Sequence, residues 1–247
     1  MKLMMLLIHL ALIAIFLPNL QADESPSKRQ IAQALKKQFA DFRAEMSEIK
    51  LSNFHGEKLE DQKTFTLYAR LEEKALKAYL SMHEPAAIKG SQFWFASQGK
   101  DNKVWMKVKG GKLREISGAN AGENLLGSEF SLMPLLPDEV KAEDISDPVW
   151  VEQDGEKRLR INWQGTERFQ KSTLYLDAKT FVPIQADFYI DEQITFQLQF
   201  LSYQTIDGLS LPQEIFAINK KTGRKSSLIW LNRDINIKFA DELFHPQ

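Results

Sequence analysis

The chain has 247 residues, with 32 lysine and arginine residues against 33 acidic ones and a formal net charge of −1. This balance argues against nucleic-acid binding, since nucleic-acid-binding domains gather basic charge on one face. The chain contains no cysteine, which excludes disulfides, cysteine-ligated metals and a lipid attached to a cysteine.

The N-terminal segment has the plan of a cleavable secretory signal. Lys2 is followed by an apolar-rich core, Leu3–Phe16, and then by a polar, small-residue stretch that ends at Ala22. The core is shorter than the roughly 20 apolar residues that a transmembrane helix needs. We therefore expect a signal over residues 1–22, cleavage after Ala22, and one mature domain over residues 23–247 in the periplasm. The alternative is an uncleaved N-terminal anchor.

The next segment predicts a long helix. Apolar residues recur at steps of three and four from Ile31 to Ile49, with charged and amide side chains between them. This period is typical of an amphipathic helix of roughly five turns, whose apolar stripe includes Phe39, Phe42 and Met46. We expect the stripe to lie against the concave face of a sheet. The alternative is a membrane-surface helix, but the polar face carries acidic as well as basic residues, which favours core packing.

From about Lys63 onward, the sequence predicts antiparallel strands. Apolar and polar residues alternate in segments such as Val104–Lys109, and this period of two indicates one buried and one solvated face. Pairs such as Gly110–Gly111 and Asp154–Gly155 predict turns between strands. We expect a mainly β (α+β) fold with a single antiparallel sheet of about eleven strands. The sheet would curl into an unclosed half-barrel around the long helix.

The alternation stops between Ser117 and Pro148. Within this interruption, the apolar stretch Leu125–Leu136 contains Pro134, which has no backbone N–H to donate to a sheet. The segment is too apolar for an ordinary solvated loop. We expect it to form a helical or loop-like lid over the concave interior.

Candidate catalytic groups are scarce. The four histidines are widely separated and form no pair with metal-ligand spacing. Ser25–Lys28 and Lys221–Gly223 resemble parts of a serine–lysine acyl-transfer motif, but the first lies in a polar lead-in and the second in a predicted turn. Carboxylate pairs such as Glu72–Glu73 lie in polar turns, where solvation is their ordinary role. The sequence therefore predicts a protein that is not an enzyme and needs no metal or cofactor.

The unusual feature is aromatic content, with 16 phenylalanines and 5 tryptophans. In Phe93-Trp94-Phe95, both faces of one predicted strand are aromatic. One interpretation is packed core with a helix on one face and a flap on the other, and the second is the wall of a cavity for a hydrophobic ligand. On the second interpretation, the candidate ligand-binding residues of cavity and lid are Phe93, Phe95, Met106, Leu126, Phe130, Met133, Leu135, Leu136, Phe196, Leu198 and Phe200.

Several blocks of sequence match one family pattern in the same order. Within Glu84–Phe93, Pro85, Lys89 and Gly90 have the spacing P-x-x-x-K-G-x-x-F, and Gly127, Ser128, Glu129 and Phe130 form a Gly-Ser-Glu-Phe block. The other blocks are Asn102–Trp105, Lys112–Ser117, Tyr175–Asp177, Phe181–Tyr189, Asp207–Pro212, Thr222–Ser226 and Asp241–Phe244. Together they resemble the bacterial outer-membrane lipoprotein-sorting protein family, which is LolA-like.

The resemblance implies an unclosed β-barrel wrapped around helices, related to the periplasmic carriers that move lipoproteins from the inner to the outer membrane. Members of this family bind acyl chains non-covalently in the concave interior. The chain departs from the pattern at Leu132–Leu136, where the family has an acidic segment, and at Gln185, where it has a basic residue.

Two functions follow as expectations. The first is a periplasmic carrier or chaperone for the acyl chains of lipoproteins or for other lipid cargo, with an inner-membrane transporter or an outer-membrane acceptor as partner. The second is a non-enzymatic adaptor or sensor for an inner-membrane exporter or another protein partner. We expect a monomer in both cases.

Overall fold

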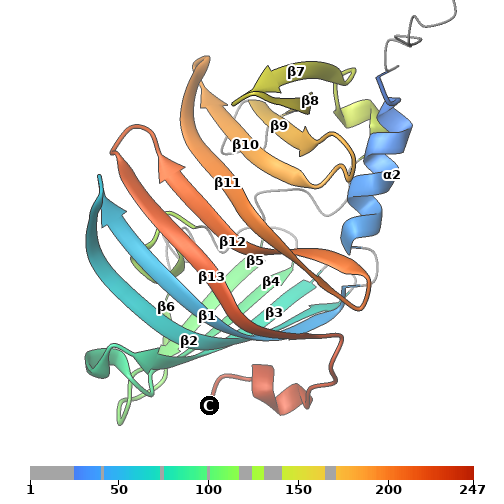
Figure 1. The fold of residues 1–247 in the computed structure, drawn as a ribbon. Coiled ribbons are helices and arrows are strands. Elements are labelled where there is room, and N and C mark those ends of the chain that lie inside the picture. Colours follow the sequence, from blue (N-terminus) through green and yellow to red (C-terminus); the bar gives the residue numbers. More distant parts are fainter. Residues whose placement is uncertain are drawn as a thin grey trace, which may run out of the picture.

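The fold is one curled antiparallel sheet with a short helix beside it. The computed structural model describes residues 25–39, 42–72, 75–98, 101–116, 124–130, 141–164 and 171–247. Within these residues there is one α-helix and a 13-stranded sheet in the order β6-β5-β4-β3-β2-β1-β13-β12-β11-β10-β9-β8-β7. Figure 1 shows the sheet bent into an open half-barrel. The mainly β class is as predicted, with slightly more strands than expected.

The sheet consists of two meanders. The first contains β1 (Ala44–His55), β2 (Lys58–Glu72), β3 (Ala75–Glu84), β4 (Gln92–Gln98), β5 (Asp101–Lys107) and β6 (Arg114–Ile116). The second contains β7 (Val149–Gln153), β8 (Glu156–Gln164), β9 (Lys171–Asp177), β10 (Pro183–Ile190), β11 (Gln193–Ile206), β12 (Leu209–Asn219) and β13 (Arg224–Ile235). Pairing of β1 with β13 joins the meanders, so the short strands β6 and β7 are the two free edges.

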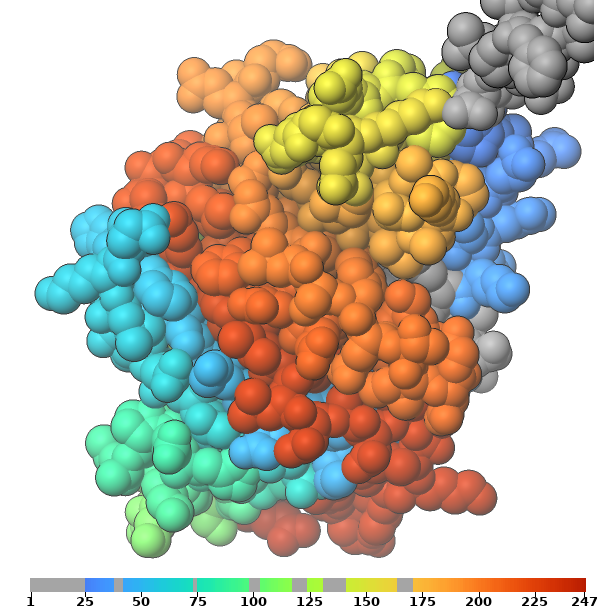
Figure 2. All heavy atoms as spheres, viewed as in Figure 1, coloured from blue at the N-terminus to red at the C-terminus, as the bar shows by residue number. Residues whose placement is uncertain are grey.

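Alternation along each strand places one apolar face on the interior of the half-barrel. On β11, Phe196 and Leu198 are buried, and they pair with Phe188 of β10 and Ala217 of β12. Rows of this kind continue across the sheet and form one main hydrophobic core. Side chains therefore fill much of the interior. Figure 2 shows the face of β11 to β13 that is turned to the viewer (orange to red) as a continuous surface.

The helix is shorter than predicted. α2 spans Lys28–Phe39, and a capping box begins it: the backbone N–H of Gln30 donates to the Ser27 hydroxyl (3.3 Å), and the N–H of Ser27 donates to the Gln30 side chain (2.7 Å). The predicted extension to Ile49 is wrong, because Met46 and Ile49 lie on strand β1.

The cause of this error is a set of buried polar residues on β1. Glu45 and Ser47 lie on the same face as the core residue Ile49, so the period of two is not visible as apolar alternation. Glu45 is satisfied within the interior: its carboxylate accepts hydrogen bonds from Trp230 Nε1 (2.8 Å) and Arg233 Nε (3.1 Å). Buried charge of this kind is tolerated only when it is paired.

The residues of the apolar stripe predicted for one helix pack into two different hydrophobic clusters. Ile31 and Leu35 of α2 are buried in the main core, whereas Phe42 follows the helix and packs against a second cluster formed by Leu209, Leu211 and Ile235. The Phe39 side chain lies outside the described residues, as do the predicted signal over 1–22 and the lid residues Met133, Leu135 and Leu136. Within the described residues, no helix has the length and apolar character needed to cross a membrane.

The packing of α2 gives a testable expectation. A helix of 12 residues is marginal alone, so its stability must come from its buried side chains. We expect Ile31→Ala, at a side chain that is 0% exposed, to lower the free energy of unfolding by about 2–4 kcal/mol in urea denaturation. The matched control Gln33→Ala, at an exposed position of the same helix, should change it by less than about 0.5 kcal/mol. Equal stability of the two variants would mean that α2 does not pack into the core.

Candidate functional site

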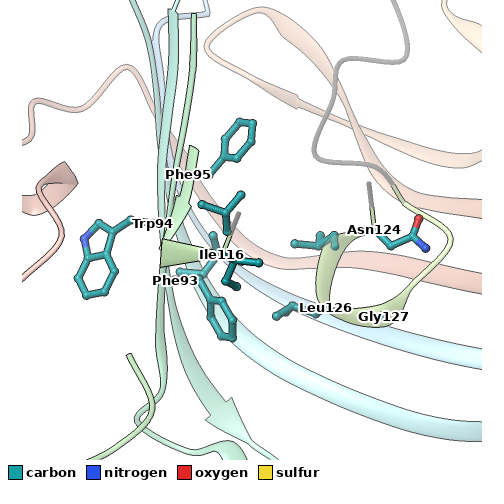
Figure 3. Close-up of a pocket in the computed structure, with 10 residues that line it drawn as sticks. Phe93, Trp94, Phe95, Ile116, Asn124, Leu126 and Gly127 are labelled. Carbon is teal, nitrogen blue, oxygen red and sulfur yellow. The ribbon is translucent and has the colours of Figure 1, made fainter. Parts of the chain in front are cut away.

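An apolar cavity of about 210 Å³ lies on the interior face of β3 to β6. Its wall on the sheet side comes from these four strands, and its other wall is the 3₁₀ helix η2 (Leu125–Gly127). Figure 3 shows the two walls facing each other across the cavity. The lining residues are Leu80, Phe93, Trp94, Phe95, Val104, Ile116, Asn124, Leu125, Leu126 and Gly127.

The register of the sheet explains why the sheet wall is apolar. Phe93 of β4 pairs with Leu80 of β3, and Phe95 pairs with Val104 of β5. Ile116 of β6 pairs with the same Val104. Residues opposite each other in neighbouring strands point to the same face of a sheet, so these five side chains form one patch on the interior.

Trp94 belongs to the opposite face of the sheet. In Figure 3 its indole points away from the cavity while Phe93 and Phe95 point toward it. On the outer face, the indole lies 5.2 Å from the Tyr79 ring and donates a hydrogen bond from Nε1 to the carbonyl oxygen of Leu243 (3.1 Å). The C-terminal segment thus contacts Phe93-Trp94-Phe95 on the outer face of the sheet. On the inner face, the cavity separates these residues from η2.

The helix η2 forms a tight loop that reaches into the half-barrel. The Leu125 N–H donates to the Phe130 carbonyl (2.7 Å), and the Ser128 N–H donates back to the Leu125 carbonyl (2.9 Å). Leu126 and Gly127 have φ values of 53° and 80°, a conformation that glycine adopts without strain and leucine does not. We call residues Leu125–Phe130 the plug, because Leu125 and Leu126 pack on the core and Phe130 is buried in it.

Glu129 anchors the plug to the sheet. Its backbone N–H donates to the Ser226 hydroxyl (2.9 Å), and its carboxylate accepts a hydrogen bond from Asn219 Nδ2 (3.0 Å). The carboxylate also lies 3.6 Å from Nε of Arg224. Ser226 in turn donates to the Asn53 side chain (2.7 Å) and is itself buried. Glu129 of the Gly-Ser-Glu-Phe block therefore holds the plug against β12 and β13, and Ser226 links this contact to β1.

The structure brings together three of the candidate ligand-binding residues, Phe93, Phe95 and Leu126, at this cavity. Met106 pairs with Phe93 on the same face but does not line the cavity. Phe130 lies buried beside η2, and Phe196, Leu198 and Phe200 lie in the main core on β11. Binding of a ligand by any of these residues stays a prediction.

The structure also places the remaining motif residues and the lining residues that the sequence analysis did not select. Pro85, Lys89 and Gly90 form the turn from β3 to β4 around η1 (Ala86–Ile88), where the Gly90 N–H donates to the Met82 carbonyl (2.9 Å). The lining residues that sequence reasoning missed are Leu80, Val104, Ile116 and Asn124, whereas Leu125 falls within the predicted lid. Alternation is able to place the three strand residues on buried faces, but only the strand order shows that these faces meet.

The described residues offer no arrangement for catalysis by a metal, since no group of three or more histidine, aspartate or glutamate side chains among them is placed to hold an ion. The string Lys221–Gly223 forms the turn between β12 and β13, as predicted, with the N–H groups of Lys221 and Thr222 donating to Asn219 Oδ1 (3.1 and 3.2 Å). The lining of the cavity is almost wholly apolar, with Asn124 as its one polar side chain.

Comparisons with known proteins place this geometry in a family. A family model described as "Uncharacterized protein" matches residues 74–247, which is more than half of the chain. Comparison with curated proteins finds no significant match.

Solved structures share the fold. The chain is similar to a DUF1329 family protein from Desulfovibrio piger, with a TM-score of 0.72, 17% identity, and coverage of 90% of this chain and 98% of that one. It is similar to a putative outer membrane lipoprotein-sorting protein domain from Vibrio parahaemolyticus, with a TM-score of 0.69, 18% identity, and coverage of 87% and 94%. A LolA superfamily protein from Nitrosomonas europaea gives a TM-score of 0.63, 16% identity, and coverage of 89% and 98%. The resemblance noted in the sequence blocks is thus confirmed at the level of the fold.

The anchor of the plug can be tested by mutation. We expect Glu129→Ala to lower the free energy of unfolding by about 1–3 kcal/mol, because it leaves Nδ2 of Asn219 without its acceptor and leaves Arg224 with Glu60 as its carboxylate neighbour. Hydrogen exchange of the plug amides, including the Leu125 N–H, should accelerate more than exchange in the β9–β10 pair. The control Glu152→Ala, at an exposed position on β7, should leave both measurements unchanged. Unaltered plug exchange in Glu129→Ala would show that this carboxylate is not an anchor.

Proposed function

The chain belongs to the family whose model matches residues 74–247, and from this premise we propose that it is a periplasmic, non-enzymatic carrier or chaperone. Its cargo would be the acyl chains of lipoproteins or another lipid, bound without a covalent bond in the apolar cavity. The observation that carries the proposal is a cavity of about 210 Å³ whose sheet wall is wholly apolar and whose other wall is an anchored plug. The structural likeness to a putative outer membrane lipoprotein-sorting protein domain supports the same role.

The proposed mechanism is burial of methylene groups between the sheet wall and the plug. Each methylene moved from water to such a site contributes about 0.8 kcal/mol. A short length of chain is therefore enough for measurable affinity, and the favourable term increases as more of the chain enters. The area of apolar contact would determine the affinity. Contacts between the protein and the head group would determine which cargo is bound.

The volume of the cavity determines which part of the protein must move to admit a complete acyl chain. A volume of about 210 Å³ is below the roughly 300–1,000 Å³ of sites for drug-sized ligands. The cavity as it stands therefore accepts only part of a long acyl chain. A complete chain requires Leu125 and Leu126 to move away from the sheet, while Glu129 keeps the far end of the plug attached to β12 and β13.

The proposal also covers export of the protein to the periplasm and its partner proteins. Residues 1–22 would be removed after export across the inner membrane, with cleavage after Ala22, and residues 23–247 would act as one domain. Because buried acyl chains leave such a cavity slowly, delivery requires help from an inner-membrane transporter or an outer-membrane acceptor that binds the loaded protein.

The second candidate function is an adaptor or sensor for a protein partner, such as an inner-membrane exporter. The observation that favours it is the filled interior: most interior-facing side chains belong to one packed core, as a rigid platform requires. On this alternative the cavity is a packing defect, and the outer surface is the functional part.

Extraction with organic solvent separates the two functions. Protein purified from the periplasm without detergent is extracted, and the extract is analysed by mass spectrometry. The carrier function predicts co-purified acyl lipid at close to one molecule per protein. Lipid-free protein that co-purifies with a stable protein partner would favour the adaptor instead.

Filling the cavity tests the location of the site. We expect Ile116→Trp to weaken binding of a fluorescent fatty acid by about tenfold or more, because the indole would occupy space lined by Phe93 and Leu126. Leu201→Trp, at a side chain that is 54% exposed on β11, is the matched control and should bind the probe like the parent. Fluorescence titration measures both, and thermal melts show whether each variant folds. Undiminished binding by a folded Ile116→Trp protein would place the acyl site elsewhere.

A further inference from the structure

Two neighbouring turns lie at one end of the first meander. The first joins β3 to β4 and contains η1, and the second joins β5 to β6. In the second turn the Gly111 N–H donates to the Val108 carbonyl (2.8 Å), and Gly110 has a φ of 72°. A Cβ added at Gly90 would lie 3.5 Å from Cδ of Lys109, so the Lys109 side chain lies against the first turn. Figures 1 and 2 show the two turns (green to light green) together at the lower left.

Both turns expose apolar side chains to solvent. Val108 and Leu113, at the two ends of the second turn, are 47% and 36% exposed. The first turn adds the exposed residues Pro85, Ala86 and Ala87. One exposed apolar side chain is ordinary on a protein surface, but several on adjoining turns form an apolar surface that is available to a partner.

The same two turns gather positive charge. Five basic residues lie in or beside them: Lys89, Lys107, Lys109, Lys112 and Arg114. In the part of the chain that the structure describes, none of these five forms an ion pair with a carboxylate. The acidic residues of the same segments are Glu84 and Glu115. We call residues 84–90 and 107–116 the basic tip, because five basic residues there stand against two acidic ones in a chain whose net charge is −1.

The carboxylates at the adjoining end of β2 do not cancel this excess, because each has a cation of its own. Asp61 Oδ1 lies 2.6 Å from Nζ of Lys63. Glu60 Oε2 lies 3.6 Å from the guanidinium of Arg224 on β13. The basic tip therefore combines uncompensated ammonium and guanidinium groups with exposed apolar side chains.

We propose that the basic tip docks the protein on an anionic lipid surface. Val108 and Leu113 enter the boundary between head groups and acyl chains, and the lysines lie among the lipid phosphates with their hydrocarbon stems on the apolar side. A neutral apolar partner would not require the cations, and a small free anion would not require the apolar side chains. An anionic bilayer is complementary to both.

Docking through the basic tip also places the apolar cavity near the lipid surface. Arg114 of the tip is two residues before Ile116 on β6, and Ile116 lines the cavity. Gly90 of the tip is likewise three residues before the lining residue Phe93. The docking itself does not depend on the carrier function, because it involves the outside of the turns and not the lining of the cavity.

The first test measures binding of the mature protein to vesicles by cosedimentation. The parent should bind vesicles of phosphatidylethanolamine and phosphatidylglycerol, and bind neutral phosphatidylcholine vesicles much more weakly. Each lysine near an anionic surface strengthens binding about fivefold, so Lys109→Glu/Lys112→Glu should weaken it by about tenfold or more. Lys220→Glu/Lys221→Glu makes the same charge change at exposed positions of the β12–β13 turn and should bind like the parent. Equal binding to both kinds of vesicle, or an equal loss in both double variants, would overturn the proposal.

The second test changes apolar contact without changing charge. Val108→Ser/Leu113→Ser should weaken binding to the anionic vesicles several-fold, because two buried side chains are lost from the lipid boundary. The control Leu201→Ser/Leu231→Ser removes side chains that are 54% and 46% exposed on β11 and β13 and should bind like the parent. Thermal melts show that each variant folds. Undiminished binding by a folded Val108→Ser/Leu113→Ser protein would mean that the apolar side chains do not enter the membrane.

A fluorescent label locates the contact directly. The chain has no cysteine, so Val108→Cys accepts a single environment-sensitive fluorophore. Its emission should shift to shorter wavelength when anionic vesicles are added, while the same label at Leu201→Cys should not respond. Vesicle binding without a response at position 108 would place the contact elsewhere and overturn the proposal.

The cavity variant separates this proposal from the carrier function. Ile116→Trp should bind anionic vesicles like the parent, and Lys109→Glu/Lys112→Glu should bind the fluorescent fatty acid like the parent. Failure of the carrier function and failure of docking therefore give different results. Loss of vesicle binding in a folded Ile116→Trp protein would assign the lipid contact to the cavity and overturn docking through the basic tip.

Discussion

The pairing of β1 with β13 is the interaction on which the rest of the structure depends. It joins residues 44–55 to residues 224–235, so two locally folded meanders become one sheet only when the ends of the domain meet. The buried pair Glu45–Arg233, with a 3.1 Å separation of Oε1 and Nε, crosses this seam. Removing either partner would leave a buried charge unpaired, which costs far more than the net value of the pair. Contacts of such long sequence separation form late and slowly in folding.

The same seam positions the candidate site. Asn53 of β1 and Ser226 of β13 are paired across it, and their side chains share a hydrogen bond of 2.7 Å. The Ser226 hydroxyl then accepts the Glu129 N–H (2.9 Å), so the plug can take its place only after the seam is closed. The cavity therefore exists because a polar anchor on one half of the sheet holds apolar residues against the other half. This arrangement fixes the plug at Glu129, against β12 and β13.

Much of the fold was predictable because alternation is a local property. The strands, the turn at Lys221–Gly223 and the single open sheet follow from it. The length of the helix was not predictable, because Glu45 and Ser47 conceal the period of β1. Ser47 donates a hydrogen bond to Glu45, but the other partners of this buried carboxylate, Arg233 and Trp230, lie more than a hundred residues away in the chain. The candidate site was predictable on β4, where Phe93 and Phe95 share a strand. The position of Phe196, Leu198 and Phe200 outside the cavity lining, and the anchoring role of Glu129, depend on strand order and cross-sheet contacts that the sequence does not encode locally.

The cavity has an energetic consequence that bears on function. The walls of the apolar cavity stand apart over about 210 Å³, so their side chains lack the close contacts that apolar groups make in the rest of the core. The anchor at Glu129 keeps the plug from moving inward to form those contacts. On the proposed carrier function, an acyl group between the sheet wall and Leu126 would supply them, and each methylene taken from water would contribute about 0.8 kcal/mol. The polar anchor and the apolar walls thus serve one requirement, because only a plug that is held at Glu129 leaves room for an apolar ligand.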